Sequence, residues 1–290
     1  MDHGPEISPE LYRAGDGEPL VLLHGFMSTW HQWRPVLADL VPFFEVVAPT
    51  LAGHLGGPLY AEEDDTLAAA GDAMERHLDG LGVDRAHLVG NSMGGALVLE
   101  LAKRGRARSV VALAPGGGWA PDSGEGVRLA RLFARQRRLA RAFAPIVPVV
   151  IRRPLLRRRA MHDVMYRGEL VPPADVVQMM RASLGCTIFP RVITSLRSGH
   201  ALIKDLERVT APTLVAWPRH DRMLPMSRHA ERFRTEIPRV EFRVLEGVGH
   251  VPNWDDPQLV AGLIRDFVQR QADAMAQPAG DRMGQKVTDP

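Results

Sequence analysis

Short apolar runs alternate with segments of helical periodicity along most of the chain. Runs of this length are typical of strands that are buried on both faces of a parallel sheet. They predict strands over residues 20–23, 44–49, 86–89, 109–115, 212–217 and 241–245, with residues 7–13 as an edge strand. Apolar residues at helical spacing predict helices over residues 30–40, 65–81, 96–102, 226–236 and 257–271. Strands that alternate with helices indicate an α/β fold with a mostly parallel central sheet and helices on both faces.

The alternation breaks after residue 115. Residues 116–206 are rich in arginine, punctuated by proline and helical in pattern, for instance over residues 127–143 and 173–184. An all-helical insert at this point predicts a cap over the carboxyl edge of the sheet, where open α/β folds bind their ligands. We therefore divide the chain into a first core part (1–115), a helical cap (116–206), a second core part (207–275) and a flexible tail (276–290).

The net charge is only +2, but it is distributed unevenly. Residues 116–205 carry 16 lysines and arginines against 6 acidic residues, whereas the remainder carries 20 against 28. Arginines interleaved with leucine and phenylalanine over residues 127–143 indicate an amphipathic basic helix, and the apolar run 146–151 follows it. Two interpretations stay open: a weak contact with an anionic lipid surface or an acidic substrate, and a cap helix with a solvated arginine face, which we favour. Nucleic acid is not expected as a partner, because no aromatic stacking surface interleaves the arginines.

The cysteine content and the N-terminus bear on disulfide bonds, metal sites and the cellular compartment. The single cysteine, Cys186, excludes an intramolecular disulfide and is interpreted as a small apolar residue in a helix, and no Cys/His cluster has the spacing of a zinc site. The N-terminus carries acidic residues where a secretory signal carries basic ones, and no apolar run approaches the roughly 18 residues that cross a bilayer. We therefore expect a cytoplasmic protein.

The pattern Gly-x-Ser-x-Gly occurs at residues 90–94, between a predicted strand and a predicted helix. A sharp turn at this point places Ser92 in a strained backbone conformation, so the residues two before and two after it must be small, as Gly90 and Gly94 are. The hydroxyl of Ser92 then projects at the edge of the sheet beside a helix N-terminus. The backbone N–H of Met93 and the positive end of that helix are suited to stabilise negative charge that develops next to Ser92.

A serine hydroxyl needs a base that accepts its proton and a third group that orients the base. His250 follows the last predicted strand in a glycine-bearing loop, and Asp221 follows the strand before it, so both belong to the same sheet edge as Ser92. The chain order Ser92, Asp221, His250 is the order expected of this layout. Two alternatives remain: His220 as the base in place of His250, and Asp221 as a surface turn residue paired with Arg222.

Other histidines and aspartates near these motifs receive structural interpretations. Asp255 and Asp256 precede a proline and are interpreted as the start of the last helix. His24 and His54 are flanked by glycine and are interpreted as structural donors in the loops around the site.

Residues 20–271 resemble an α/β-hydrolase-fold protein with an inserted helical cap. The motifs that carry the resemblance are His24-Gly25-Phe26, the serine turn with Gly94-Gly95, His220-Asp221-Arg222 with Pro225, and Gly249-His250. In such proteins the residue after His-Gly supplies the second oxyanion donor, so the resemblance assigns the backbone N–H of Phe26 to that role beside Met93. Residues 50–57 depart from the Asp-x-x-Gly-His-Gly-x-Ser loop of many relatives, which leaves the substrate side of the site open.

The resemblance implies a serine hydrolase, esterase- or lipase-like, that cleaves a carboxylic ester, lactone or thioester through an acyl-enzyme without metal or organic cofactor. Ser92 argues against the haloalkane dehalogenases and epoxide hydrolases of this fold, which place aspartate at the turn. Residues 91–95 are also similar to carbon–carbon bond hydrolases that open ring-cleavage products, and that activity would need a pocket arginine such as Arg181 or Arg191. Other similar proteins keep the triad as small-molecule receptors with little turnover, and cofactor-free perhydrolases share it too.

Overall fold

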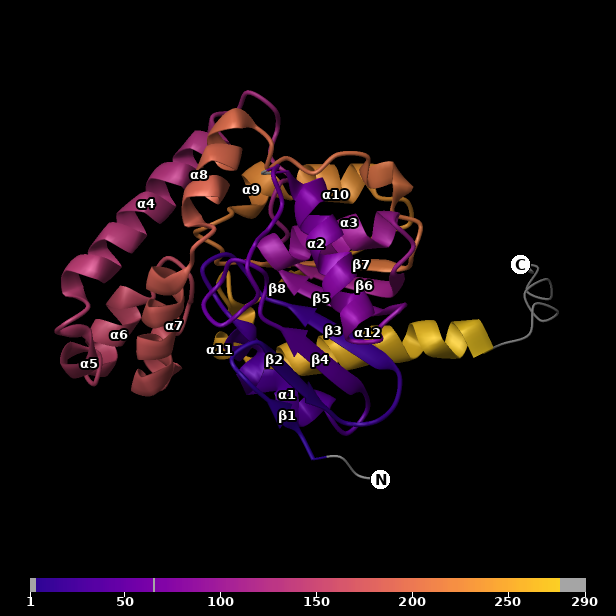
Figure 1. Ribbon diagram of the computed structural model, residues 1–290, viewed down its shortest axis with the longest axis horizontal. Coiled ribbons are helices and arrows are strands. Elements are labelled where there is room, and N and C mark those ends of the chain that lie inside the picture. Colours follow the sequence, from indigo (N-terminus) through magenta and orange to yellow (C-terminus); the bar gives the residue numbers. More distant parts are fainter. Residues whose placement is uncertain (1–3, 65, 277–290) are drawn as a thin grey trace, which may run out of the picture.

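An eight-stranded sheet lies at the centre of the molecule in the computed structural model, which describes residues 4–64 and 66–276 (Figure 1). The strand order is β1-β2-β4-β3-β5-β6-β7-β8. In this order, each strand from β4 through β8 is parallel to its neighbours within that part of the sheet. At the edge, β1 pairs antiparallel with β2, and β2 pairs antiparallel with β4. The strands are β1 (Glu6–Ile7), β2 (Leu11–Ala14), β3 (Pro19–Leu23), β4 (Glu45–Pro49), β5 (Ala86–Asn91), β6 (Ala107–Leu113), β7 (Thr213–Pro218) and β8 (Glu241–Leu245).

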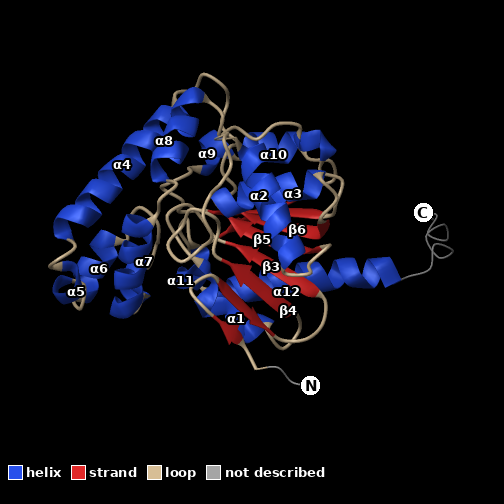
Figure 2. Cartoon of the chain, in the orientation of Figure 1, coloured by secondary structure: helices blue, strands red, loops and turns tan. Residues whose placement is uncertain are grey.

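Helices cover both faces of this sheet (Figure 2). One face packs against α1 (Arg34–Leu40) and α12 (Pro257–Ala276), which contact each other, while α2 (Leu67–Gly80), α3 (Met93–Lys103) and α10 (Glu231–Glu236) cover the other. The sequence predicts this α/β arrangement correctly. The tail predicted over residues 276–290 lies outside the described residues, apart from Ala276 at the end of α12.

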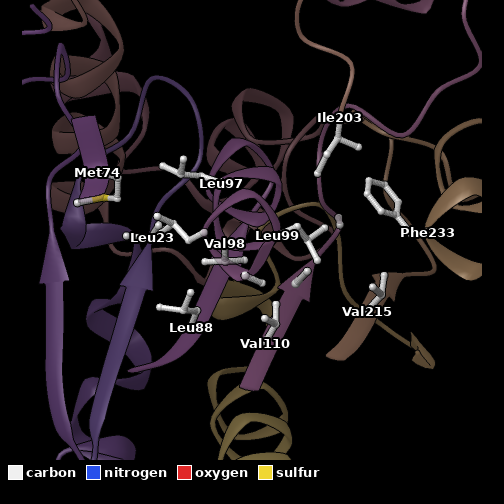
Figure 3. Packing of buried hydrophobic residues seen from close by; sticks show 14 of the residues in the cluster. Leu23, Met74, Leu88, Leu97, Val98, Leu99, Val110, Ile203, Val215 and Phe233 are labelled. Carbon is white, nitrogen blue, oxygen red and sulfur yellow. The ribbon is translucent and has the colours of Figure 1, made fainter. Parts of the chain in front are cut away.

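Side chains of each central strand alternate between two cores, one on each side of the sheet. In β3, for example, Leu20 and Leu22 belong to the core beneath α1 and α12, whereas Val21 and Leu23 belong to the core beneath α3. Figure 3 shows the second core, where strand residues such as Leu88 and Val215 meet α3 and Phe233. Because both faces are buried, most positions are apolar, and this explains the apolar runs.

A helical insert separates β6 from β7 and lies to one side of the sheet (Figure 1). Its helices are α4 (Glu125–Phe143), α5 (Val147–Val150), α6 (Pro154–Ala160), α7 (Pro173–Gly185) and α8 (Phe189–Ser198). Across the part of the chain that the structure describes, no helix is long and apolar enough to span a membrane.

Three predicted elements differ in detail from the structure. The edge strand predicted over residues 7–13 is two short antiparallel strands, because Pro9 cannot donate a ladder hydrogen bond and the Ser8 hydroxyl accepts one from the N–H of Leu11 at 3.0 Å. The helix predicted over residues 30–40 begins as a 3₁₀ turn, Trp30–Trp33, preceded by Thr29. The helix predicted over residues 226–236 is divided at Ala230 into α9 (Met226–His229) and α10.

Candidate active site

Ser92 lies in the turn between β5 and α3, with φ 57° and ψ −115°. A positive φ is costly for a residue with a side chain and persists only where the surroundings enforce it. The turn is crowded: a Cβ at Gly90 would lie 2.1 Å from the carbonyl oxygen of Gly94, and one at Gly94 would lie 2.1 Å from that of Leu23. The two glycines of the motif are therefore required by contact with backbone.

The backbone N–H groups of Met93 and Phe26 are the candidates for binding an anionic oxygen at Ser92. Met93 is the first residue of α3, so its N–H points out of the helix at the positive end of the helix dipole. The loop after β3 runs alongside, since a Cβ at Gly25 would lie 3.4 Å from the Cβ of Ser92. Among the described residues, neither the N–H of Met93 nor that of Phe26 donates to a protein acceptor. The geometry suits an oxyanion-binding site.

His250 and Asp221 meet in the loops that follow β8 and β7. Nδ1 of His250 lies 2.7 Å from Oδ2 of Asp221, and both side chains are buried. The other carboxylate oxygen of Asp221 accepts hydrogen bonds from the N–H groups of Met223 at 2.9 Å and Leu224 at 2.7 Å. Because these contacts hold the carboxylate as an acceptor, the imidazole carries its proton on Nδ1, and Nε2 keeps a lone pair that can accept a proton.

A chain of buried amides connects the three loops of the site. Asn91, directly before Ser92, donates from Nδ2 to the backbone oxygens of His250 and Leu113, each at 3.0 Å. Its Oδ1 accepts from Gln32 Nε2 at 2.9 Å, and Gln32 Oε1 accepts from the N–H of Gly25 at 3.0 Å. The motifs of the sequence do not predict this network, although an amide at the end of a buried strand is itself a signal that polar partners lie nearby.

The hydroxyl of Ser92 makes no hydrogen bond to any described residue. In structures without substrate, catalytic hydrogen bonds are often long and shorten only when substrate binds. The structure thus places His250 against the residue that precedes Ser92 and leaves the serine oxygen open to the cavity described below.

Asp255 connects the His250 loop to the helical insert. Its buried carboxylate accepts hydrogen bonds from the N–H groups of Gly249 at 2.7 Å, Tyr166 at 2.9 Å and Arg167 at 2.6 Å. The interpretation of Asp255 as the start of the last helix is therefore wrong, whereas Asp256 does accept a hydrogen bond from the first turn of α12. A buried carboxylate with three backbone donors fixes the position of the loop that carries His250.

Two other histidines near the site, His220 and His24, make contacts that do not involve the Asp221 carboxylate. His220 stacks on Tyr166, with ring centroids 4.0 Å apart. The carboxylate of Asp221 therefore pairs with His250 and not with His220. His24 is fully buried, and its Nδ1 lies 2.8 Å from the oxygen of Gly25 while its Nε2 accepts from the N–H of Leu51 at 2.9 Å. It therefore acts as an acceptor as well as a donor. Burial holds the pKa of His24 well below its usual range, so the ring is neutral.

A cavity of about 170 Å³ opens beside Ser92, between the sheet edge, α2 and the insert. Its walls are mostly apolar and include Phe26, Met93, Leu129, Phe133, Ile188 and Val192. The polar residues of the lining include His54, whose Nε2 has no partner among the described residues, and Arg191, which donates from Nη2 to the oxygen of Glu63 at 2.6 Å. Arg181 is exposed and does not line the cavity. In the described part of the chain, no cluster of His, Cys, Asp and Glu is suited to hold a metal ion.

The buried His54 makes stability depend on pH. Burial lowers its pKa from 6.5 to about 4, so as pH falls below 6.5 the unfolded chain takes up a proton that the folded protein refuses. This contribution is intact above pH 6.5 and is lost as pH falls towards 4. Between about pH 7 and pH 5, one such histidine removes about 2 kcal/mol of unfolding free energy. Urea unfolding at the two pH values is expected to show that His54→Gln loses about 2 kcal/mol less than wild type.

The exposed His200 provides the control for this measurement. His200→Gln is expected to keep the wild-type difference between the two pH values. An equal pH effect in His54→Gln and wild type would contradict the prediction.

Comparisons with known proteins agree with this architecture. The model of the alpha/beta hydrolase family matches residues 20–263. The chain is 31% identical over 210 residues to the epoxide hydrolase EphH of Mycobacterium tuberculosis, covering 70% of this chain and 94% of that protein. It is 29% identical to a 2-hydroxymuconate semialdehyde hydrolase of Pseudomonas sp. (strain CF600), covering 93% of each chain. The structure of 2-hydroxy-6-oxo-6-phenylhexa-2,4-dienoate hydrolase from Rhodococcus sp. strain RHA1 matches with a TM-score of 0.71 and 23% identity, covering 91% of this chain and 99% of that one.

Proposed function

Because the chain belongs to the alpha/beta hydrolase family, we propose that it is a serine hydrolase that cleaves a carboxylic ester, lactone or thioester of a small to medium apolar substrate. The observation that carries the proposal is the buried pair of Asp221 and His250, held by hydrogen bonds against the turn that contains Ser92. The apolar lining of the cavity beside Ser92 supports the choice of an apolar substrate.

The proposed reaction begins with attack of Ser92 Oγ on the ester carbonyl while Nε2 of His250 accepts the hydroxyl proton. The N–H groups of Phe26 and Met93 bind the oxyanion that forms. Asp221 holds the imidazole in the required tautomer and stabilises the imidazolium. His250 then gives the proton to the leaving alcohol, and water attacks the acyl-enzyme through the same relay in reverse.

Carbon–carbon bond hydrolysis is the second candidate, and the 2-hydroxymuconate semialdehyde hydrolase that this chain resembles along most of its length supports it. A substrate of that kind carries a carboxylate, which an arginine in the cavity would hold. Arg191 is the arginine that lines the cavity, but it donates to the oxygen of Glu63 and lies 5.2 Å from the Tyr60 ring centroid. Because Arg191 already makes these contacts, we favour ester hydrolysis over the carbon–carbon reaction.

Two other hypotheses about the function have less support. An epoxide hydrolase of this fold places a carboxylate at position 92, and this chain has a serine there, so we do not extend the activity named for the similar EphH to it. A triad-bearing receptor would form the same site and bind its ligand with little turnover.

A fluorophosphonate tests whether Ser92 is an activated nucleophile. We expect intact-mass analysis to show one covalent adduct on wild type and none on Ser92→Ala, because only a serine with a positioned base and oxyanion donors reacts at neutral pH. Ser28→Ala, which changes a serine in the loop after β3, serves as the matched control and is expected to label like wild type. Absence of an adduct on wild type, or its persistence in Ser92→Ala, would contradict the assignment.

Substrate panels then separate the candidates. Turnover of p-nitrophenyl butyrate above that of a 2-hydroxy-6-oxo-dienoate supports ester hydrolysis, and the reverse order supports the carbon–carbon reaction. A protein that labels with fluorophosphonate but turns over neither class would favour the receptor.

A further inference from the structure

The outer end of the helical insert exposes an unusual number of apolar side chains. We call residues 135–159, from the second half of α4 through α5 and α6, the insert tip. Of the 13 large apolar side chains that the described residues expose, six lie here: Leu139, Phe143, Ile146, Val149, Leu155 and Leu156. Leu155 is 80% exposed and Val149 is 68% exposed. Single exposed apolar residues are ordinary, but a group of this kind marks an interaction surface.

The same 25 residues carry nine arginines and no acidic residue. Three of the arginines are engaged: Arg137 with the oxygen of Leu184, Arg157 with three backbone oxygens, and Arg158 with Glu169 at 3.9 Å. The others are exposed and have no acidic partner among the described residues; they are Arg135, Arg138, Arg141, Arg152, Arg153 and Arg159. The insert tip therefore combines exposed apolar side chains with positive charge that no acidic side chain of the described residues neutralises.

Exposed arginines and exposed apolar side chains occur close together along the insert tip. Arg135, Leu139 and Phe143 follow one another at intervals of four residues, which places them in one row along α4. Arg152 and Arg153 directly precede α6, which carries Leu155 and Leu156. Figure 1 shows α5 and α6 at the end of the molecule farthest from the C-terminal end of α12. The surface thus stands clear of the core.

We propose that the insert tip docks on the surface of an anionic lipid bilayer. Arginine side chains bind lipid phosphates while the interleaved leucine, valine and phenylalanine side chains enter the boundary between headgroups and acyl chains. Charge complementarity favours an anionic partner, and the apolar group favours a bilayer over a purely ionic one. Nucleic acid fits less well, because Phe143 is the only aromatic residue in the insert tip. The contact is peripheral, and it does not depend on the proposed function.

Sedimentation with vesicles tests the proposal. We expect the full chain to bind vesicles of phosphatidylglycerol mixed with phosphatidylcholine, to bind more weakly as salt increases, and to ignore vesicles of phosphatidylcholine alone. The triple variant Arg135→Gln, Arg141→Gln, Arg153→Gln is expected to lose about 100-fold in affinity, since each arginine near an anionic surface contributes about fivefold. The double variant Val149→Ser, Leu155→Ser is expected to lose about tenfold, because the apolar contact is removed.

A matched control removes the same charge elsewhere. Arg197, Lys204 and Arg208 are exposed outside the insert tip. Changing all three to glutamine is expected to leave vesicle binding within about twofold of wild type, because 0.1 M salt largely screens charges that lie more than about 10 Å from the membrane surface. Circular dichroism of every variant confirms that the fold is kept.

A fluorophore at the tip reports insertion directly. Cys186 is fully buried, and burial raises the pKa of its thiol to about 11, so it competes poorly for a thiol-reactive dye. Val149→Cys labelled with an environment-sensitive dye is expected to shift to shorter wavelength with anionic vesicles and to stay unchanged without them.

Four outcomes would overturn the proposal. They are no binding to anionic vesicles, equal loss in the control triple variant, unchanged binding in Val149→Ser, Leu155→Ser, and dimerisation in the absence of lipid that this double variant abolishes. The last would make the insert tip an interface between proteins.

Discussion

Replacing Ser92 with alanine is expected to lower kcat for p-nitrophenyl butyrate by about three orders of magnitude or more while the fold stays intact. Members of a triad act as a unit, so removal of the nucleophile removes the contribution of the base as well. Alanine fits the site, because it keeps the Cβ of Ser92 and adds no atom to the turn. The loop at Gly25 already accommodates this Cβ, since even a Cβ built at Gly25 would lie 3.4 Å from it. The strained φ of 57° is unchanged by the substitution.

Steady-state kinetics and thermal unfolding check this prediction together. We expect KM to change little and the melting temperature to stay near that of wild type, since the hydroxyl makes no hydrogen bond to a described residue. Ser28→Ala is the control and should keep wild-type turnover. Turnover within tenfold of wild type in Ser92→Ala would show that a different residue is the nucleophile.

The sheet could be predicted from the sequence because its signal is local. A strand buried on both faces is mostly apolar, as Leu20, Val21 and Leu22 are, and such a run is visible without any knowledge of its neighbours. The signal of the turn at Ser92 is local as well. A side chain at either flanking glycine would clash with backbone atoms that lie only a few residues away or on the adjacent strand. Edge strands lack this signal, and the break at Pro9 shows how one residue changes the outcome.

The partners within the site depend on contacts that are distant in the sequence. The sequence proposes His250 and leaves His220 as a rival, and only the folded chain shows that Tyr166 of the insert stacks on His220. The sequence predicts the wrong role for Asp255 for the same reason. One of its three donors belongs to the His250 loop, and the other two belong to the insert, almost 90 residues earlier in the chain. The sequence predicts that the arginine-rich helix is amphipathic, but which of its side chains stay exposed depends on how the insert folds.

Replacing Asp221 with asparagine is expected to lower kcat by about 10⁴-fold, the magnitude typical of this change in a Ser-His-Asp triad. The amide oxygen can still accept hydrogen bonds from the N–H groups of Met223 and Leu224, which turns the NH₂ group towards His250. Nδ1 of His250 must then be the acceptor, and the imidazole proton moves to Nε2. A protonated Nε2 cannot take the proton of Ser92, so the geometry survives and the base is lost.

Asp256→Asn is the matched control for this substitution. Asp256 accepts one backbone hydrogen bond, from Leu259 at 2.9 Å, and an amide oxygen can replace the carboxylate there without touching the tautomer of His250. We expect wild-type turnover in Asp256→Asn and a parallel fall of turnover and fluorophosphonate labelling rate in Asp221→Asn. If Asp221→Asn kept turnover within tenfold of wild type, the carboxylate would be structural, and the orientation of His250 would have to come from its backbone contact with Asn91.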